Sequence, residues 1–335
     1  MLNMASVDCE TSMLAHAARL HLVQVRVPSS AENPGYLSKD RVASYAATQE
    51  IIVPRENIYS RIIDRIPWNP AACLKFVEFG FGTGAFLQRL VSVCRERQQR
   101  ARVAAFDLSP QMGELAKFAL ERELTKDADI EISLVTGVNC LDPEFSSPLF
   151  DDAEPIDVVA QLQFAHYAPN SHESFLGRKT RQDGTPRLTK PEWLQRLRDW
   201  LAPNGILFEF DDFAGASTLE DEIGLKAWDL WVLRQLRDPQ VQDRIGQTYP
   251  RLVQSIVKRY SKGDSLEEML SAVERHRTKR RSVCREEVVT LDRYLSWLRE
   301  TFGSGSTVHL ETGLGFSHQR FKLLMTRKTW IESSL

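Results

Sequence analysis

Long apolar runs are missing from this sequence of 335 residues, although 42% of its residues are hydrophobic. No stretch approaches the roughly 18 apolar residues that a membrane-spanning helix needs. The composition still supplies enough apolar residues for a sizeable buried core. Asp8 and Glu10 stand where a signal peptide would be basic and then apolar, so the sequence predicts a soluble, cytoplasmic protein.

Cysteine is scarce as well, and its few positions show no pattern. The five residues are Cys9, Cys73, Cys94, Cys140 and Cys284. Their number is odd, and their spacing matches neither a disulfide framework nor a metal site. The sequence therefore predicts a reduced protein without a bound metal.

A strong net charge is also lacking, since 43 Lys and Arg residues against 45 Asp and Glu residues give −2. No global field therefore draws the protein to nucleic acid or to a membrane. One local basic run, residues 275–281, is flanked by acids on both sides. It reads either as a patch for a phosphate backbone or as the basic end of a helix, which keeps RNA open as a partner.

The most informative segment that is present is KFVEFGFGTGAF, residues 75–86. An apolar run ends at Glu78, Gly80, Gly82 and Gly84 follow, and a helical pattern of apolar residues begins at once. A strand, a glycine turn and a helix present bare backbone and a helix N-terminus to a nucleotide-like ligand. Glycine suits this turn because a side chain would block the ligand or forbid the backbone angles.

Two nucleotide-type cofactors compete for this loop. Gly80, Gly82 and Ala85 satisfy the dinucleotide pattern, which is weak on its own, and a turn without any ligand is the plainest reading. Glu78 with the three glycines gives E-x-G-x-G-x-G instead. That sequence resembles motif I of the class I S-adenosylmethionine-dependent methyltransferases.

A second acid agrees with this resemblance. Residues 101–107 read as the next strand and end in Asp107, 23 residues after Gly84. A carboxylate there can accept a hydrogen bond from each ribose hydroxyl of a nucleoside, or it can be a solvated strand end. In the family the matching acid binds the ribose, so the resemblance implies that role for Asp107. Leu108 and Met112, at the start of the following helix, are then expected to flank the adenine.

The third strand is expected at residues 130–135. The family often has Gly-Asp-Ala after this strand, with the acid reaching the adenine amino group. This chain has Gly137, Val138 and Asn139, so that acid is missing. The resemblance leaves either the Asn139 amide or the Cys140 backbone to take its place.

The end of the chain carries the pattern of a hairpin. Residues 307–310 and 320–326 alternate between apolar and polar, with glycines between them. Class I methyltransferases end in such a hairpin, whose seventh strand is antiparallel to the rest. With further strands at 156–162 and 206–210, the resemblance implies an α/β fold: a doubly wound seven-stranded sheet with an antiparallel last strand. It spans residues 70–215 and 286–330.

Two segments elaborate this core. Residues 1–69 are predicted to form an N-terminal helical lid, with helices near 13–25, 39–52 and 57–66. The family places a tyrosine of such a lid near the methionine carboxylate, and Tyr45 is the best match here. Residues 216–285 predict a helical insertion after strand five that caps the substrate, whose Trp228 and Trp231 line an apolar pocket or pack in the cap's own core.

The loop after the strand at 156–162 borders the transferred methyl group in this fold. It offers Gln161 and Gln163 to the cofactor, and His166 and Tyr167 to the reaction. A base is needed only when the acceptor is a hydroxyl or an acidic carbon. Histidine as a residue type titrates near neutral pH, so His166 is the candidate base or orienting residue, unless it only binds the loop backbone. Asp211, with Asp212 beside it, can instead hold a cationic amine or act as the base.

A basic loop follows at residues 171–190. It is long for a strand-to-helix connection, and such loops are commonly lids or binding segments. Arg178 and its basic neighbours predict a clamp for an anionic group on the substrate, whereas a solvated basic loop is the simpler reading.

Together the sequence predicts an S-adenosylmethionine-dependent methyltransferase acting on a small molecule. The accepting atom stays open, as does a homodimer. One alternative is an RNA methyltransferase, because QFAHY is similar to the Q-F-A-x-H-Y of the messenger-cap guanine methyltransferases. The other is a non-catalytic subunit of the same fold that binds a partner.

Overall fold

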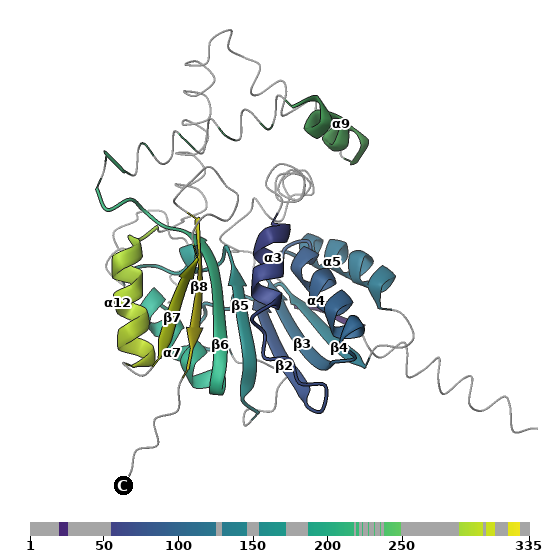
Figure 1. Cartoon of the computed structure of the whole chain (residues 1–335), viewed down its shortest axis with the longest axis horizontal. Helices are drawn as coiled ribbons and strands as arrows, with labels where there is room; N and C mark the ends of the chain where they lie inside the picture. The colour runs from purple at the N-terminus through teal and green to yellow at the C-terminus, as the bar shows by residue number, and fades with distance from the viewer. Residues whose placement is uncertain are drawn as a thin grey trace, which may run out of the picture.

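A mixed sheet of eight strands forms the centre of the computed structural model (Figure 1). The structure describes residues 20–25, 55–124, 129–145, 154–171, 187–217, 219–220, 238–248, 288–303, 306–311 and 321–328, together with 223, 227, 231 and 235. The strands are β1 (Leu20–Gln24), β2 (Cys73–Phe79), β3 (Arg100–Asp107), β4 (Ile130–Thr136), β5 (Ile156–Leu162), β6 (Leu201–Asp212), β7 (Thr307–Glu311) and β8 (Phe321–Arg327).

The strand order is β1-β4-β3-β2-β5-β6-β8-β7. The strands from β1 to β6 run parallel to one another, whereas β8 is antiparallel to both β6 and β7. The predicted doubly wound sheet with an antiparallel last strand is therefore confirmed. The order reverses between β2 and β5, which is where doubly wound sheets bind ligands, at the carboxyl ends of the strands.

The strand count differs from the seven that were expected. The eighth strand is β1, which pairs in parallel with β4 at one edge of the sheet. A helix was predicted over residues 13–25, and for residues 20–24 this prediction is wrong. Leu20 and Leu22 pack against the core while His21 and Val23 are exposed, so the period of two of a strand prevails over the helical period.

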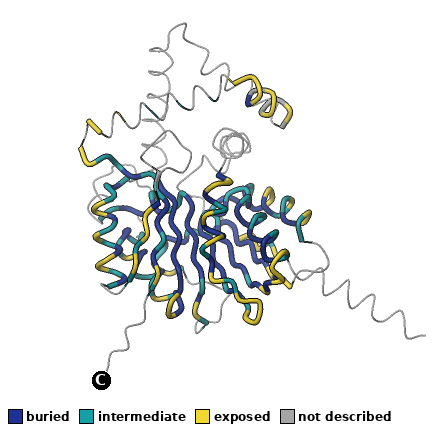
Figure 2. Tube along the Cα trace, viewed as in Figure 1, coloured by how far each residue is buried: buried dark blue, intermediate teal, exposed yellow. Residues whose placement is uncertain are grey.

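Helices cover both faces of the sheet (Figure 1). On one face lie α3 (Glu56–Ile63), α4 (Ala85–Glu96) and α5 (Pro110–Glu123), and on the other lie α7 (Lys190–Trp200) and α12 (Leu291–Phe302). Because both faces are covered, the central strands are buried over most of their length, as Figure 2 shows. The described end of the predicted lid, α3, confirms a helix within residues 57–66.

The strand β6 begins earlier than expected, at Leu201, and includes the predicted turn at residues 202–205 as an irregularity. Asn204 has a positive φ of 66°. A Cβ atom on Gly205 would lie 2.9 Å from the carbonyl oxygen of Ala202 and 3.0 Å from that of Ile156. Any side chain at position 205 would crowd these two carbonyl oxygens, so the close approach of the backbone there requires glycine.

The insertion at 216–285 is described in part. The helix α9 (Pro239–Thr248) lies within it and agrees with the helical character predicted for this segment. The described residues between 219 and 235 are also helical. Tyr45, Arg178, Trp228, the helix expected at 39–52 and the basic run at 275–281 lie outside the described residues.

Candidate functional site

The glycine loop after β2 has the backbone that its sequence predicts. Gly80, Gly82 and Gly84 have φ angles of 72°, 54° and 77°. Gly84 is the N-cap of α4, and a Cβ atom there would lie 2.8 Å from the Cβ atom of Ala116 in α5. Glycine at this position is therefore required twice, by the left-handed backbone and by the close approach of a neighbouring helix.

Asp107 at the end of β3 lies directly against this loop. Its Oδ2 accepts a hydrogen bond of 3.0 Å from the backbone N–H of Gly82, and its Oδ1 accepts one of 2.8 Å from Ser109. Burial raises the pKa of Asp107 to about 6, and the bonds from Ser109 and Gly82 oppose that rise. The structure thus brings together the loop and the acid predicted to hold the two ends of a nucleoside.

Glu78, two residues before the loop, has an unsatisfied oxygen. The residue is 2% exposed, and its Oε2 has no hydrogen-bond partner among the described residues. Its pKa is raised to about 8, first by burial and then by the charge of Asp107, while the charge of Arg55 opposes the rise. A cationic or hydrogen-bond-donating ligand group would satisfy this oxygen, as the ammonium of S-adenosylmethionine would.

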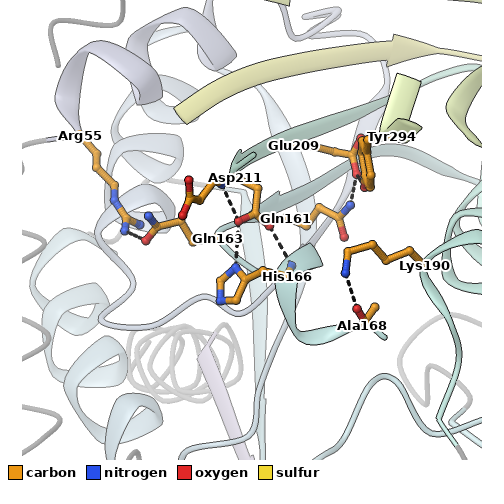
Figure 3. A network of polar contacts seen from close by, with 10 residues as sticks. Arg55, Gln161, Gln163, His166, Ala168, Lys190, Glu209, Asp211 and Tyr294 are labelled. Carbon is orange, nitrogen blue, oxygen red and sulfur yellow. Dashed lines mark hydrogen bonds and ion pairs between the residues drawn. The ribbon is translucent and has the colours of Figure 1, made fainter. Parts of the chain in front are cut away.

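Arg55 is a site residue that no sequence pattern indicated. It precedes α3, is 7% exposed and donates a hydrogen bond to Oε1 of Gln163 (Figure 3). Its guanidinium carbon lies 5.9 Å from the ring centroid of Phe210 at the end of β6. Gln163 has a positive φ of 60°, and its backbone N–H binds the carbonyl oxygen of Phe210. Arg55 therefore adds a positive charge to the switch point between β2 and β5.

His166 pairs with Asp211, although these residues were predicted as alternatives. Both backbone and ring bind the acid: His166 N donates to Oδ2 at 3.0 Å, and Nδ1 lies 2.8 Å from Oδ1 (Figure 3). Both side chains are largely buried, at 12% and 4% exposure. The backbone N–H of Asp212 also donates to Asp211 Oδ1, at 2.8 Å. With Asp211 as acceptor, the neutral ring carries its proton on Nδ1 and its basic nitrogen is Nε2.

Tyr167 lies next to this pair in the short 3-10 helix Ala165–Tyr167. Its ring centroid is 4.1 Å from that of His166, at an interplanar angle of 47°. The two predicted catalytic residues are therefore in contact.

Gln161 lies apart from the other cofactor candidates. It is fully buried, its Nε2 donates to Glu209, and its Oε1 accepts a bond of 2.8 Å from Trp193 Nε1. Alternation along β5 turns its side chain toward α7, so both ends of the amide are used inside the core.

The remaining candidates surround the loop to different degrees. Leu108 is half-buried, whereas Met112 is 2% exposed and packs in the core beneath α5. Asn139 accepts a hydrogen bond of 3.2 Å from the backbone of Leu141, and Cys140 is 3% exposed, with burial raising its thiol pKa. Trp231 is half-buried in a helical segment.

No family model and no curated protein matches this sequence. Solved structures do match, and several of them are methyltransferases. An O-methyltransferase family protein from Burkholderia thailandensis is 12% identical with a TM-score of 0.44, covering 89% of this chain and 62% of its own. The CurJ carbon methyltransferase is 12% identical with a TM-score of 0.47, covering 88% and 59%. Phosphoethanolamine N-methyltransferase 2 from Haemonchus contortus, in complex with S-adenosyl-L-methionine, is 12% identical with a TM-score of 0.42, covering 88% and 58%.

These similarities concern the general path of the chain. This protein spans 62%, 59% and 58% of the length of the three structures. Among the described residues, no helix is long and apolar enough to cross a membrane.

Proposed function

We propose that this protein transfers a methyl group from S-adenosylmethionine to a small-molecule acceptor. The single observation that supports this most is the hydrogen bond between Asp107 and the backbone of Gly82. It joins the carboxyl ends of β2 and β3 at the switch point of the sheet, within reach of one nucleoside.

Each part of the cofactor has a partner in this proposal. Asp107 accepts hydrogen bonds from the ribose hydroxyls, the unsatisfied oxygen of Glu78 receives the cationic end, and Arg55 the carboxylate. Leu108 and the Asn139 amide contact the adenine. When bound, S-adenosylmethionine supplies an electrophilic methyl group on a sulfonium sulfur.

The paired His166 and Asp211 favour an acceptor with a proton to lose, such as a hydroxyl group. With S-adenosylmethionine bound, Nε2 of His166 would accept the proton of the acceptor hydroxyl as its oxygen takes the methyl group and S-adenosylhomocysteine is left. Asp211 stabilises the imidazolium that forms. A neutral amine would need only orientation, so a built base is the feature that separates these acceptor classes.

The lid and the insertion complete the proposal. Residues 1–69 with Tyr45 would cover the cofactor, and residues 216–285 with Trp228 and Trp231 would wall the acceptor pocket. Arg178 would bind an anionic group of the acceptor.

Two measurements test this function. Calorimetry with S-adenosylmethionine, S-adenosylhomocysteine and NAD is expected to show binding of the first two only, and Asp107→Ala is expected to abolish it. A screen of small hydroxyl compounds with a labelled methyl donor then identifies an acceptor. With it, His166→Gln is expected to lower turnover by about 100-fold or more while cofactor affinity stays unchanged.

The opposite results are equally clear. Binding of NAD without S-adenosylmethionine would contradict the cofactor. Full turnover by His166→Gln would contradict the role of the histidine but leave the cofactor standing.

A further inference from the structure

Polar side chains occupy neighbouring positions on β5 and β6 in a largely apolar layer. The layer is the face of the sheet that packs against α7 and α12, where Val159, Leu207 and Leu324 lie. Gln161 of β5 and Glu209 of β6 stand opposite each other in register and point into this layer. Asp211 follows Glu209 by two residues, so it lies on the same face.

Gln161 and Glu209 belong to one hydrogen-bonded set that reaches two helices, and Figure 3 labels its members Gln161, Glu209 and Tyr294. Tyr294 of α12 and Gln161 both donate to Oε1 of Glu209, and Trp193 of α7 donates to Gln161. The set Trp193, Gln161, Glu209 and Tyr294, here called the polar brace, is at most 1% exposed at every member. It therefore ties β5, β6, α7 and α12 to one another inside the core.

The buried carboxyl group of the polar brace is unfavourable for the stability of the core. Oε2 of Glu209 is buried and has no hydrogen-bond partner among the described residues. Burial raises the pKa of Glu209 to about 8, bonds from Tyr294 and Gln161 oppose the rise, and the charge of Asp211 adds to it. An apolar side chain of similar size would avoid this cost, so the acid calls for another explanation.

Its position next to the His166–Asp211 pair supplies one. His166 follows β5 by four residues and Asp211 is the last residue but one of β6, so their 2.8 Å contact depends on how these strands are placed. Hydrogen bonds weaken steeply with distance and angle, and a small shift of β5 against β6 would loosen this contact. The polar brace joins β5 to β6 at Glu209, which lies two residues before Asp211.

We propose that the polar brace is a positioning device for the His166–Asp211 pair, through which α7 and α12 set the direction of the histidine ring. This proposal rests on the function proposed above. None of the brace residues contacts the reacting atoms. Asp211 is the acid that contacts His166, whereas Glu209 lies in the core, where burial raises its pKa to about 8.

The test uses the full-length protein and needs no acceptor. Nitrogen-15 labelling of histidine reports which ring nitrogen of His166 carries the proton, and His166→Gln assigns its signals among the seven histidines. Wild type and Glu209→Gln are expected to hold the proton on Nδ1, since glutamine keeps an acceptor for Tyr294 and Gln161. Glu209→Ala is expected to shift the ratio of the two tautomers about ten-fold toward Nε2, equivalent to about 1.4 kcal/mol.

A control separates positioning from stability. Leu298→Ala removes a fully buried side chain of α12 outside the brace, and it is expected to lower stability without changing the tautomer ratio. An unchanged ratio in Glu209→Ala, or an equal shift in Leu298→Ala, would overturn the proposal.

If Glu209→Ala does not fold, Tyr294→Phe serves instead, because it keeps the ring that packs on Phe213 and Trp297. It is expected to shift the ratio about three-fold, equivalent to about 0.7 kcal/mol; no shift would overturn the proposal. Calorimetry with S-adenosylhomocysteine distinguishes the two hypotheses. Wild type that fails to bind contradicts the proposed function and leaves the tautomer result valid.

Discussion

Some site residues of this protein can be recognised from their spacing in the sequence, and others only from their contacts in the structure. The glycine loop and Asp107 follow patterns of spacing, and the structure brings them together as the spacing predicts. Arg55 and Glu209 follow none, because their contacts join residues 108 and 85 positions apart. His166 and Asp211 were each identifiable as reactive groups, but their pairing depends on the register of β5 and β6.

Gly84 offers a prediction at this level. Gly84→Ala would place a Cβ atom 2.8 Å from Ala116 and strain a backbone with φ of 77°. We expect it to lower the free energy of unfolding by about 2–4 kcal/mol, from overlap and left-handed strain together. Ala116→Gly is the matched background, since it removes the Cβ atom that the new side chain would meet. In that background Gly84→Ala should cost about 1–2 kcal/mol in urea unfolding, from the left-handed strain alone, and an equal loss in both backgrounds would contradict the overlap.

Secondary structure elements were predicted best where buried on both faces. The bounds of β5 match the expectation at both ends, and those of β3 and β4 are close to it, because continuous apolar runs leave little ambiguity. The edge strand β1 was mistaken for a helix, since five residues with two inward leucines suit either period. What decided its structure was the open edge of β4, which a local pattern does not contain.

An ion-pair cluster joins the helix α3 to the distant strand β7. Arg61 donates to Glu311 at 2.6 Å, and Arg65 also pairs with it. Burial alone would raise the pKa of Glu311, but the bond from Arg61 and the charges of Arg65 and Arg61 outweigh burial and lower it. Glu311 therefore contributes stability above its ordinary pKa of 4.5, which is lost as the pH falls through the lowered value.

Glu311→Gln is expected to lower the free energy of unfolding at pH 7 by about 1–2 kcal/mol, since it leaves two arginines without their acid. The difference from wild type should shrink as the pH falls below 4.5 and through the lowered pKa of Glu311. Glu121→Gln, which removes the exposed pair with Lys117, should cost less than about 0.5 kcal/mol. Urea titrations at pH 7 and pH 3.5 measure both, and a loss that persists at low pH would exclude the charge as its cause.

The molecule as a whole buries acids on both faces of its sheet at one end. Glu78 and Glu209 have pKa values of about 8, and Asp107 of about 6, each raised first by burial. In the unfolded chain these groups ionise near 4.5, 4.5 and 3.8. At low pH these buried groups are neutral in the folded and the unfolded chain alike. As the pH rises toward 8 the unfolded chain loses these protons first, so the folded state loses stability.

We accordingly expect the unliganded protein to lose stability between pH 5 and pH 8. Glu209→Gln removes one contributing proton, so its stability relative to wild type should rise over this range by at least about 1 kcal/mol. Thermal unfolding at pH 5, 6.5 and 8 tests this. If stability changed with pH equally in variant and wild type, Glu209 would ionise alike in the folded and the unfolded protein, which would contradict this prediction.

The place of β8 has a consequence for the order in which the protein can be built. This strand is synthesised after β7 but lies between β6 and β7. Until residues 321–327 leave the ribosome, β6 has an unpaired edge, and β7 has nothing to join. The pairing of the strand that bears Glu209 and Asp211 is thus completed late in translation, and nascent chains halted before residue 321 should hold the glycine loop ready while β6 still has an open edge.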